Sequence, residues 1–176
     1  MLRIEGSDAT ARKLIYDLLA LATLMISLRN MIAEGISLSG PQYSIFMGVG
    51  RFQGTHGVST GAIAKLLCVS PAFVTTEVQK LIALGLLHKR RNPNDRRKVL
   101  LSVSQHGRMV IESYARRVQW MNDGLLARIS SEELRAMSRL VDRLVKNNTR
   151  TLRILRGGIK AGPARRAPVG EVALTE

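Results

Sequence analysis

The chain has 176 residues, of which 45% are hydrophobic and 4% aromatic, so it has enough apolar material for one globular domain with an aliphatic core. Its 27 Lys and Arg residues outnumber 13 Asp and Glu residues, and the net charge of +14 favours a polyanionic partner, either nucleic acid or an acidic membrane surface. A single cysteine excludes an internal disulfide framework, and the polar N-terminus lacks the apolar core of a signal peptide, so a cytoplasmic location is expected.

The first long helix is predicted from Ser7 or Asp8 to about Glu34. Its main apolar stripe consists of Leu14, Leu18, Leu21, Met25 and Leu28, and other apolar side chains lie around it. A helix that is apolar on most sides must be buried on most sides, and in a small protein a second subunit has to share that burial. The run Leu14–Leu28 is interrupted by Asp17 and is shorter than a membrane span, so burial against helices is expected and no membrane partner is predicted.

A second helix is predicted to begin at Ser39 and Pro41. A helix-turn-helix is predicted to follow it. Ser59 is a suitable N-cap for its first short helix, and Ser70, followed by Pro71, for its second. The buried stripes are expected to be Ile63, Leu66 and Leu67, and then Val74, Val78, Leu81 and Leu84. The outward residues of the second helix are Ala72, Phe73, Thr75, Thr76, Gln79 and Lys80. Such a small, polar face with one charge suits a helix in the major groove, and an ordinary surface helix is the alternative.

A basic hairpin is predicted next. Leu86–Arg91 and Lys98–Val103 have strand patterns, and the turn-forming residues 92–95 separate them. The cations of the tip and flanks are Lys89, Arg90, Arg91, Arg96, Arg97 and Lys98. Crowded cations repel one another, and a phosphate backbone or a narrow minor groove relieves that repulsion. Asp95 can pair with Arg97 and fix its direction, whereas a solubilising charged turn is the alternative.

Two more helices are predicted after the hairpin. Ser104 caps one that reaches about Ile129, and Ser130 with Glu133 forms a capping box for the last. The last helix has a stripe at alternating steps of three and four, typical of helix-to-helix association, which consists of Leu134, Met137, Val141 and Leu144. From Arg156 onward, Gly, Pro and Arg predict a flexible basic tail. Because the terminal helices have more apolar surface than one copy can cover, a homodimer is expected.

The hairpin and the helix pair resemble the MarR (multiple antibiotic resistance regulator) family of bacterial transcription factors. The family's wing pattern is D-x-R-x-x-x-L-x-L-T with Gly after two further residues, and the matching residues here are Asp95, Arg97, Leu101, Val103, Ser104 and Gly107. The helix pair matches at Ile63-Ala64, Leu67, Val69-Ser70, Val74-Thr75 and Leu81. Cys68 departs from the pattern, because the family usually has Gly in that turn, where a left-handed backbone is cheap only for Gly.

The resemblance implies a mainly α fold with a small β-hairpin wing, in one MarR-type domain over residues 1–176. A winged helix-turn-helix lobe is expected over 39–104, dimerisation helices over 7–38 and 105–155, and the flexible basic tail over 156–176. The implied function is that of a sequence-specific DNA-binding transcriptional regulator, in this family most often a dimeric repressor released by a small-molecule ligand. A two-fold homodimer is expected to bind double-stranded DNA at a pseudo-palindromic operator with half-sites about 10 base pairs apart.

The residues expected to contact DNA are Ser70, Ala72, Phe73, Thr75, Thr76, Gln79, Lys80, Arg90, Asn94, Asp95, Arg96, Arg97 and Lys98. Among them the resemblance implies that Arg97 enters the minor groove, whereas phosphate contacts are assigned to Lys80, Arg90, Arg96 and Lys98. Many members of the family also bind a small aromatic or phenolic ligand. By position, Arg29, Tyr43 and Phe46 are the candidate ligand-binding residues, with ordinary core packing as the alternative.

Enzyme motifs are not found in the sequence: there is no P-loop, no GxGxxG after a strand, no GxSxG and no HExxH. His56, His88 and His106 have no metal-ligand spacing with Cys68, so no metal, cofactor or catalytic residue is expected. Two rival functions stay open. One is a non-specific, basic architectural DNA-binding protein, and the other is a redox switch or enzyme that uses Cys68, for which a small packed thiol is the simpler interpretation.

Overall fold

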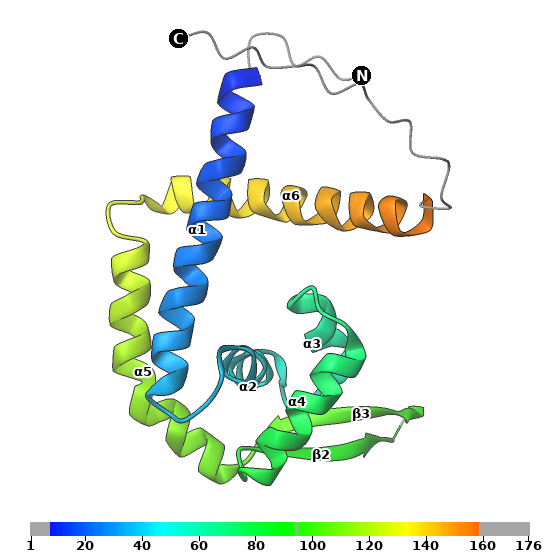
Figure 1. Ribbon diagram of the computed structural model, residues 1–176. Coiled ribbons are helices and arrows are strands. Elements are labelled where there is room, and N and C mark those ends of the chain that lie inside the picture. Colours follow the sequence, from blue (N-terminus) through cyan, green and yellow to red (C-terminus); the bar gives the residue numbers. More distant parts are fainter. Residues whose placement is uncertain (1–7, 94, 159–176) are drawn as a thin grey trace, which may run out of the picture. The chain divides into compact units, whose positions relative to one another are not determined.

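The computed structural model of the chain describes residues 8–93 and 95–158, without the side chains of residues 8, 96–98 and 158. Six helices and three short strands follow in the order α1 (Asp8–Glu34), α2 (Gly40–Phe52), β1 (Val58–Ser59), α3 (Thr60–Leu66), α4 (Pro71–Ala83), β2 (Leu87–Asn92), β3 (Asp95–Val103), α5 (Gln105–Leu125) and α6 (Ser131–Gly158) (Figure 1). The predicted class, mainly α with a small wing, is confirmed. The chain divides into two compact units after Asp123, and each is described by itself.

Serine side chains begin five of the helices, as the sequence predicted. The backbone N–H three residues after each serine donates to its hydroxyl, at Ser39, Ser59, Ser70, Ser104 and Ser130. At Ser130 the capping box is complete, because its own N–H donates to Glu133 at 2.8 Å. The Ser130 hydroxyl also donates to this carboxylate at 2.7 Å, and the two hydrogen bonds, from the side chain and the backbone of Ser130, lower the pKa of Glu133 below its ordinary value. Ser7, the other predicted cap, lies outside the described residues.

The wing is part of a three-stranded antiparallel sheet in the order β1-β3-β2. β2 and β3 pair from Leu87 opposite Val103 to Arg91 opposite Val99, and the register shifts at Asn92. The sequence analysis missed β1, in which Val58 pairs with Leu101, because two residues are too short for an alternating pattern. β1 ties the segment before α3 to the central strand of the sheet.

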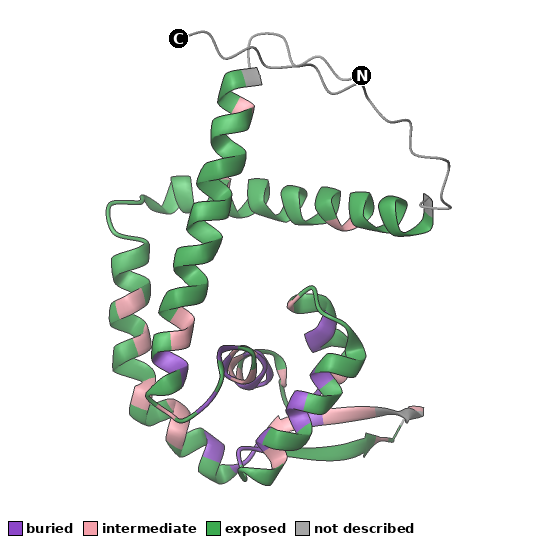
Figure 2. Ribbon diagram, in the orientation of Figure 1, coloured by how far each residue is buried: buried purple, intermediate pink, exposed green. Residues whose placement is uncertain are grey.

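The core lies in the winged lobe. Its fully buried side chains include Ile45, Phe46, Val49, Ile63, Val74, Leu81, Leu87 and Leu101, and Figure 2 shows this burial around α2, α3 and α4. Leu66 and Leu84, predicted to face inward, are instead 46% and 50% exposed. Leu66 is the last residue of α3 and Leu84 follows the last of α4, so each lies at a helix end and is only partly covered.

The helix α1 is exposed along most of its length, and its buried residues Ile32 and Ala33 lie in the last turn (Figure 2). The expectation that it is too short for a membrane span is wrong, because the helix continues beyond Leu14–Leu28, and Ala9–Glu34 is long and apolar enough by length and composition. The helix α6, in the other unit, has its predicted stripe of Leu134, Met137, Val141 and Leu144 exposed as well. Both helices carry apolar faces that no described residue of their own unit covers.

Gly107 joins the start of α5 to the wing. A Cβ atom at this position would lie 2.3 Å from the carbonyl oxygen of Leu86 and 2.8 Å from a methyl carbon of Val103. The neighbouring Ser104 accepts the Gly107 N–H at 2.8 Å and donates to the Gly85 carbonyl at 2.6 Å, so the backbone segments are bonded together. Only glycine fits without moving the backbone, which explains the Gly of the wing pattern.

Replacing Gly107 with alanine should therefore lower the free energy of unfolding by about 1–3 kcal/mol or more, the usual cost of overpacking a core. Gly61→Ala in α3 is the matched control, because its Cβ would meet nothing within 4 Å. Alanine favours a helix over glycine by up to about 1 kcal/mol, so the control should be neutral or stabilising. Urea denaturation at one fixed protein concentration measures both variants. Equal stability of the two would contradict the tight packing at Gly107.

Candidate nucleic-acid interface

The helix α4 divides into a buried and an exposed face as predicted. Val74, Val78 and Leu81 are buried, whereas the predicted outward residues Ala72, Phe73, Thr75, Thr76, Gln79 and Lys80 are all exposed. Phe73, the one aromatic residue of this face, is 39% exposed. Sequence reasoning missed Glu77, which is buried on the inward face. Its carboxylate accepts from the Lys80 ammonium at 2.8 Å, and an i, i+3 spacing is the signal that could have found this pair.

The two threonines of α4 present hydroxyl oxygens to the outside. Thr75 donates its hydroxyl proton to the Pro71 carbonyl at 2.9 Å, and Thr76 donates to the Ala72 carbonyl at 3.2 Å. Because a hydroxyl has one donor and two acceptor lone pairs, each oxygen remains an acceptor. Such oxygens match the amino groups that adenine and cytosine present in the major groove.

Gln79 and Lys80 lie on the exposed side near the wing. The Lys89 ammonium of β2 approaches the Gln79 amide oxygen at 3.5 Å, so the amide nitrogen of Gln79 remains available as a donor. The Lys80 side chain is 55% exposed beside Glu77, which leaves its ammonium within reach of solvent. The exposed face of α4 therefore offers donors and acceptors but little charge.

The wing directs its cations to both faces of β2. Lys89 lies toward α4, whereas the next residue, Arg90, donates from Nη2 to the His56 carbonyl at 2.8 Å, in the loop before β1. Asp95 begins β3 opposite Asn92. Asn94 and the side chains of Arg96, Arg97 and Lys98 lie outside the described residues, so their predicted DNA contacts stay predictions.

The turn between α3 and α4 holds Cys68 in the left-handed region, with φ at 55°. This confirms the left-handed backbone at the turn position where the MarR family usually has glycine. The interpretation of Cys68 as a packed thiol is wrong, because the residue is exposed. The turn has to reverse the chain between two short helices, so its central residue cannot reach the core. Within residues 8–93 and 95–158, no three His, Cys, Asp or Glu residues lie close enough to hold a metal ion.

Replacing Cys68 with glycine should raise the free energy of unfolding by up to about 1 kcal/mol. The left-handed backbone costs a residue with a Cβ roughly 1–2 kcal/mol, and the flexibility of unfolded glycine offsets part of that gain. Cys68→Ser keeps the Cβ and serves as the control, with stability close to that of the parent. Chemical denaturation compares the three proteins, and a destabilised Cys68→Gly variant would show that the thiol contributes more than the strain.

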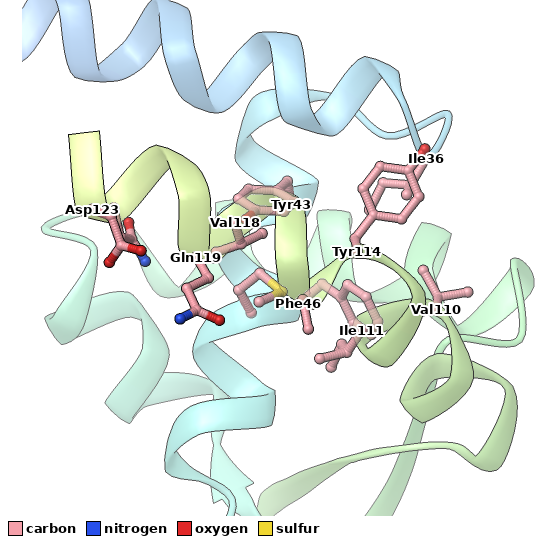
Figure 3. A pocket seen from close by; sticks show the side chains of 12 residues that line it. Ile36, Tyr43, Phe46, Val110, Ile111, Tyr114, Val118, Gln119 and Asp123 are labelled. Carbon is pink, nitrogen blue, oxygen red and sulfur yellow. The ribbon is translucent and has the colours of Figure 1, made fainter. Parts of the chain in front are cut away.

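A second candidate site is an apolar cavity of about 380 Å³ between α2 and α5 (Figure 3). Its walls are Ile36, Tyr43, Phe46, Met47, Val110, Ile111, Tyr114, Ala115 and Val118, with Gln119, Asn122 and Asp123 at a polar end. Tyr114 donates to the carbonyl of Gly35, which holds the end of α1 against α5. Burial raises the pKa of Tyr43, so its phenol is neutral at physiological pH.

Two of the three predicted ligand residues, Tyr43 and Phe46, line this cavity, but Arg29 does not. Arg29 instead lies beside Gly40 at the start of α2, and its Nε is buried without a hydrogen-bond partner among the described residues. Its position on α1 turns the side chain to the first turn of α2 rather than toward α5. Sequence reasoning missed the α5 wall, although Val110, Tyr114 and Val118 recur at four-residue steps, which places them on one helix face.

The arrangement of two short helices, an exposed second helix and a hairpin wing defines a winged helix-turn-helix protein. The sequence profile of the MarR family matches residues 36–98, from the end of α1 into the wing. Over these residues the chain is similar to the MarR family.

Two curated relatives come from Bacillus subtilis (strain 168). The uncharacterized HTH-type transcriptional regulator YwhA is 32% identical over 92 residues, which cover 52% of this chain and 66% of the relative. The uncharacterized HTH-type transcriptional regulator YdgJ is 29% identical over 90 residues, or 51% of this chain and 55% of the relative. The matches thus span just under two thirds and about half of these relatives.

Solved structures show the same fold at low identity. A putative MarR family transcriptional regulator from Listeria monocytogenes, complexed with 26mer DNA, has a TM-score of 0.70 and 16% identity, covering 85% of this chain and 97% of that chain. CouR from Rhodococcus jostii RHA1, bound to p-coumaroyl-CoA, has a TM-score of 0.69 and 19% identity, covering 79% of this chain and 96% of that chain.

Proposed function

We propose that this chain is a sequence-specific DNA-binding transcriptional regulator. The observation that carries the proposal is the exposed face of α4, which bears hydroxyls and an amide beside a basic wing and has Lys80 as its charged residue. The major groove admits one α-helix, and hydroxyl and amide groups read base edges there. The resemblance to the Listeria monocytogenes regulator complexed with DNA supports the same use of this lobe.

The rival is an architectural protein that coats DNA without reading its sequence. Such a protein gains affinity from every cation placed near a phosphate, so the low charge on the exposed face of α4 does not favour this function. In our proposal Arg90, Arg96 and Lys98 of the wing contact phosphates together with Lys80 of α4, while Arg97 of the wing enters the minor groove. In this arrangement the uncharged side chains of α4 contact bases, and most of the phosphate contacts come from the wing.

The active form in this proposal is a homodimer. The apolar face of α1, with Leu14 51% and Leu24 62% exposed, and the stripe of α6 need an occupant, and a second copy supplies both faces at once. This assigns residues 7–38 and 105–155 to dimerisation and 39–104 to DNA binding. The predicted start of the flexible tail at Arg156 is wrong, because α6 continues to Gly158, and residues 159–176 lie outside the described residues. A two-fold dimer presents two α4 helices, and it therefore binds a pseudo-palindrome with half-sites about one helical turn apart.

The proposal includes a location in the cytoplasm, where bacterial DNA is found, and an activity of binding rather than catalysis. Burial of α1 against a second copy is the reason for preferring this over membrane insertion, although α1 is long enough to span a bilayer. Repression follows when the bound dimer occludes RNA polymerase. The target genes are those whose promoters contain the pseudo-palindromic site that the dimer binds.

A small aromatic or phenolic ligand regulates the binding in this proposal. The cavity between α2 and α5 is apolar with a polar end, and the related CouR is bound to p-coumaroyl-CoA, an aromatic ligand. Phe46 lines the cavity and is also fully buried in the lobe core, and α2 packs against α4. A ligand that favours one placement of α2 therefore shifts α4, and it weakens DNA binding if that placement misses adjacent major grooves.

The DNA-reading proposal is tested by selecting duplexes from a random library at about physiological salt, where non-specific phosphate binding is weak. An enriched pseudo-palindrome is expected. Arg97→Ala should lower affinity for the selected site by roughly 1–3 kcal/mol while leaving the dimer intact. Arg117→Ala on the exposed side of α5 is the control of equal charge. Salt-sensitive binding without an enriched sequence would favour the architectural protein, and unchanged affinity of Arg97→Ala would contradict the wing assignment.

The ligand proposal is tested by filling the cavity. Ala115→Phe adds a ring at an exposed wall position and should keep DNA binding while abolishing release by phenolic probes such as p-coumarate. Trp120 is the single tryptophan and follows the cavity residue Gln119 in the sequence, so a change in its fluorescence is used as the signal of binding. Ala127→Phe, outside the cavity, is the control. If a panel of phenols and aromatic acids leaves both fluorescence and DNA binding of the parent unchanged, this ligand class is wrong.

A further inference from the structure

A polar hollow of about 850 Å³ lies at the base of the wing, on the face of β2 that carries Arg90 rather than Lys89. The loop at residues 53–57, strand β2, the end of β3 and the start of α5 surround it. The charged or ionisable side chains in its lining are Arg90, Arg108, His56 and His88. No Asp or Glu is among its lining residues, all of which are described. Neither the α4 face nor the apolar cavity uses this surface.

Hydrogen bonds aim the arginines and hold the loop beside them. Arg90 donates from Nη2 to the His56 carbonyl at 2.8 Å, and Arg108 donates from Nη1 to the Val103 carbonyl at 3.3 Å. The loop residue Gln53 accepts the Val103 N–H at 2.8 Å, which fixes the loop on β3. A guanidinium has five N–H donors, so each arginine retains donors for a ligand.

The first turn of α5 adds to the positive potential of the hollow. Gln105, its first residue, is in the lining, and the turn contains no acidic residue. Glu112 lies one helical turn beyond Arg108 and lines a neighbouring hollow that Arg108 also borders. Glu112 is thus outside the lining of the hollow, whose polar side chains are cations, imidazoles and neutral groups.

We propose that this hollow binds a phosphoryl group. A phosphoryl group has several anionic oxygens in a tetrahedral arrangement, and it can accept from donors that converge from different elements, as the arginines of β2 and α5 do here. Arginine is suited to this task because its fork of donors matches phosphate oxygens. Two sources have this chemistry: the DNA backbone beyond the bases that α4 reads, and a free phosphorylated small molecule.

The binding test uses the full chain in the absence of DNA. Inorganic pyrophosphate is the probe, and its binding is measured by calorimetry at low ionic strength. The parent protein should bind, and Arg90→Gln and Arg108→Gln should each weaken binding about tenfold or more, because each removes charge-assisted hydrogen bonds. Arg117→Gln removes the same charge from an exposed position of α5 outside the hollow and should leave the affinity unchanged.

The salt dependence of DNA binding distinguishes the two sources. If the site holds the DNA backbone, Arg108→Gln should also lower the slope of log affinity against log salt by about 1, whereas a site for a free phosphorylated molecule leaves that slope unchanged. Absence of pyrophosphate binding, or equal binding by the parent and all three variants, overturns the proposal. The first measurement contains no DNA, so its failure leaves the proposed reading of DNA by α4 untouched.

Discussion

The close contact between Gly107 and the Leu86 carbonyl is the constraint on which the winged lobe depends. It brings the start of α5 against the base of the wing, and Phe46 of α2 lies within reach of the same position. The hydrogen bonds of Ser104 close the junction from both sides. Because α5 also forms one wall of the apolar cavity, a single backbone contact sets the wing, the cavity and the hollow at the wing base relative to one another.

Burial is distributed unevenly, and this unevenness is informative. The lobe packs Ile45, Phe46 and Val49 completely, whereas α1 leaves large side chains such as Leu24 in solvent. Each square ångström of apolar surface removed from water is worth roughly 25 cal/mol, so such a helix face is a strong site for association. The lobe is therefore stable through its own core, while the outer helices are completed by a second copy in the proposed dimer.

Much of this structure followed from local sequence signals. Serines at Ser59, Ser70 and Ser104 marked helix starts because an N-cap interaction spans only three residues. The outward face of α4 followed from helical periodicity alone. The two-residue strand β1 had no such signal, since its formation depends on β3 some forty residues away. Leu84 and Arg29 were misplaced for a related reason, because periodicity gives a helix face but does not say which neighbour, or whether any, lies against it.

The same limit applies to the residues of the candidate sites. Side chains on one element, such as Thr75 and Gln79, could be assigned to a face from spacing, but the partners of a side chain could not. Arg90 shows this: the sequence placed it with the other wing cations, whereas the structure bonds it to His56 across the sheet. Arg90 and Arg108 are far apart in the sequence, so the sequence could not predict that they border one hollow.

The net charge of +14 is thus not a uniform property of the surface. The described face of α4 carries Lys80, whose charge is partly balanced by Glu77, while arginines gather at the wing and its base. Phosphate contacts give affinity without sequence information, whereas base contacts give the information. A helix that must distinguish bases gains from low charge, because strong phosphate attraction would hold it equally well to every sequence. In the proposed function, separation of charge from the α4 face is therefore the physical basis on which the protein binds DNA both tightly and selectively.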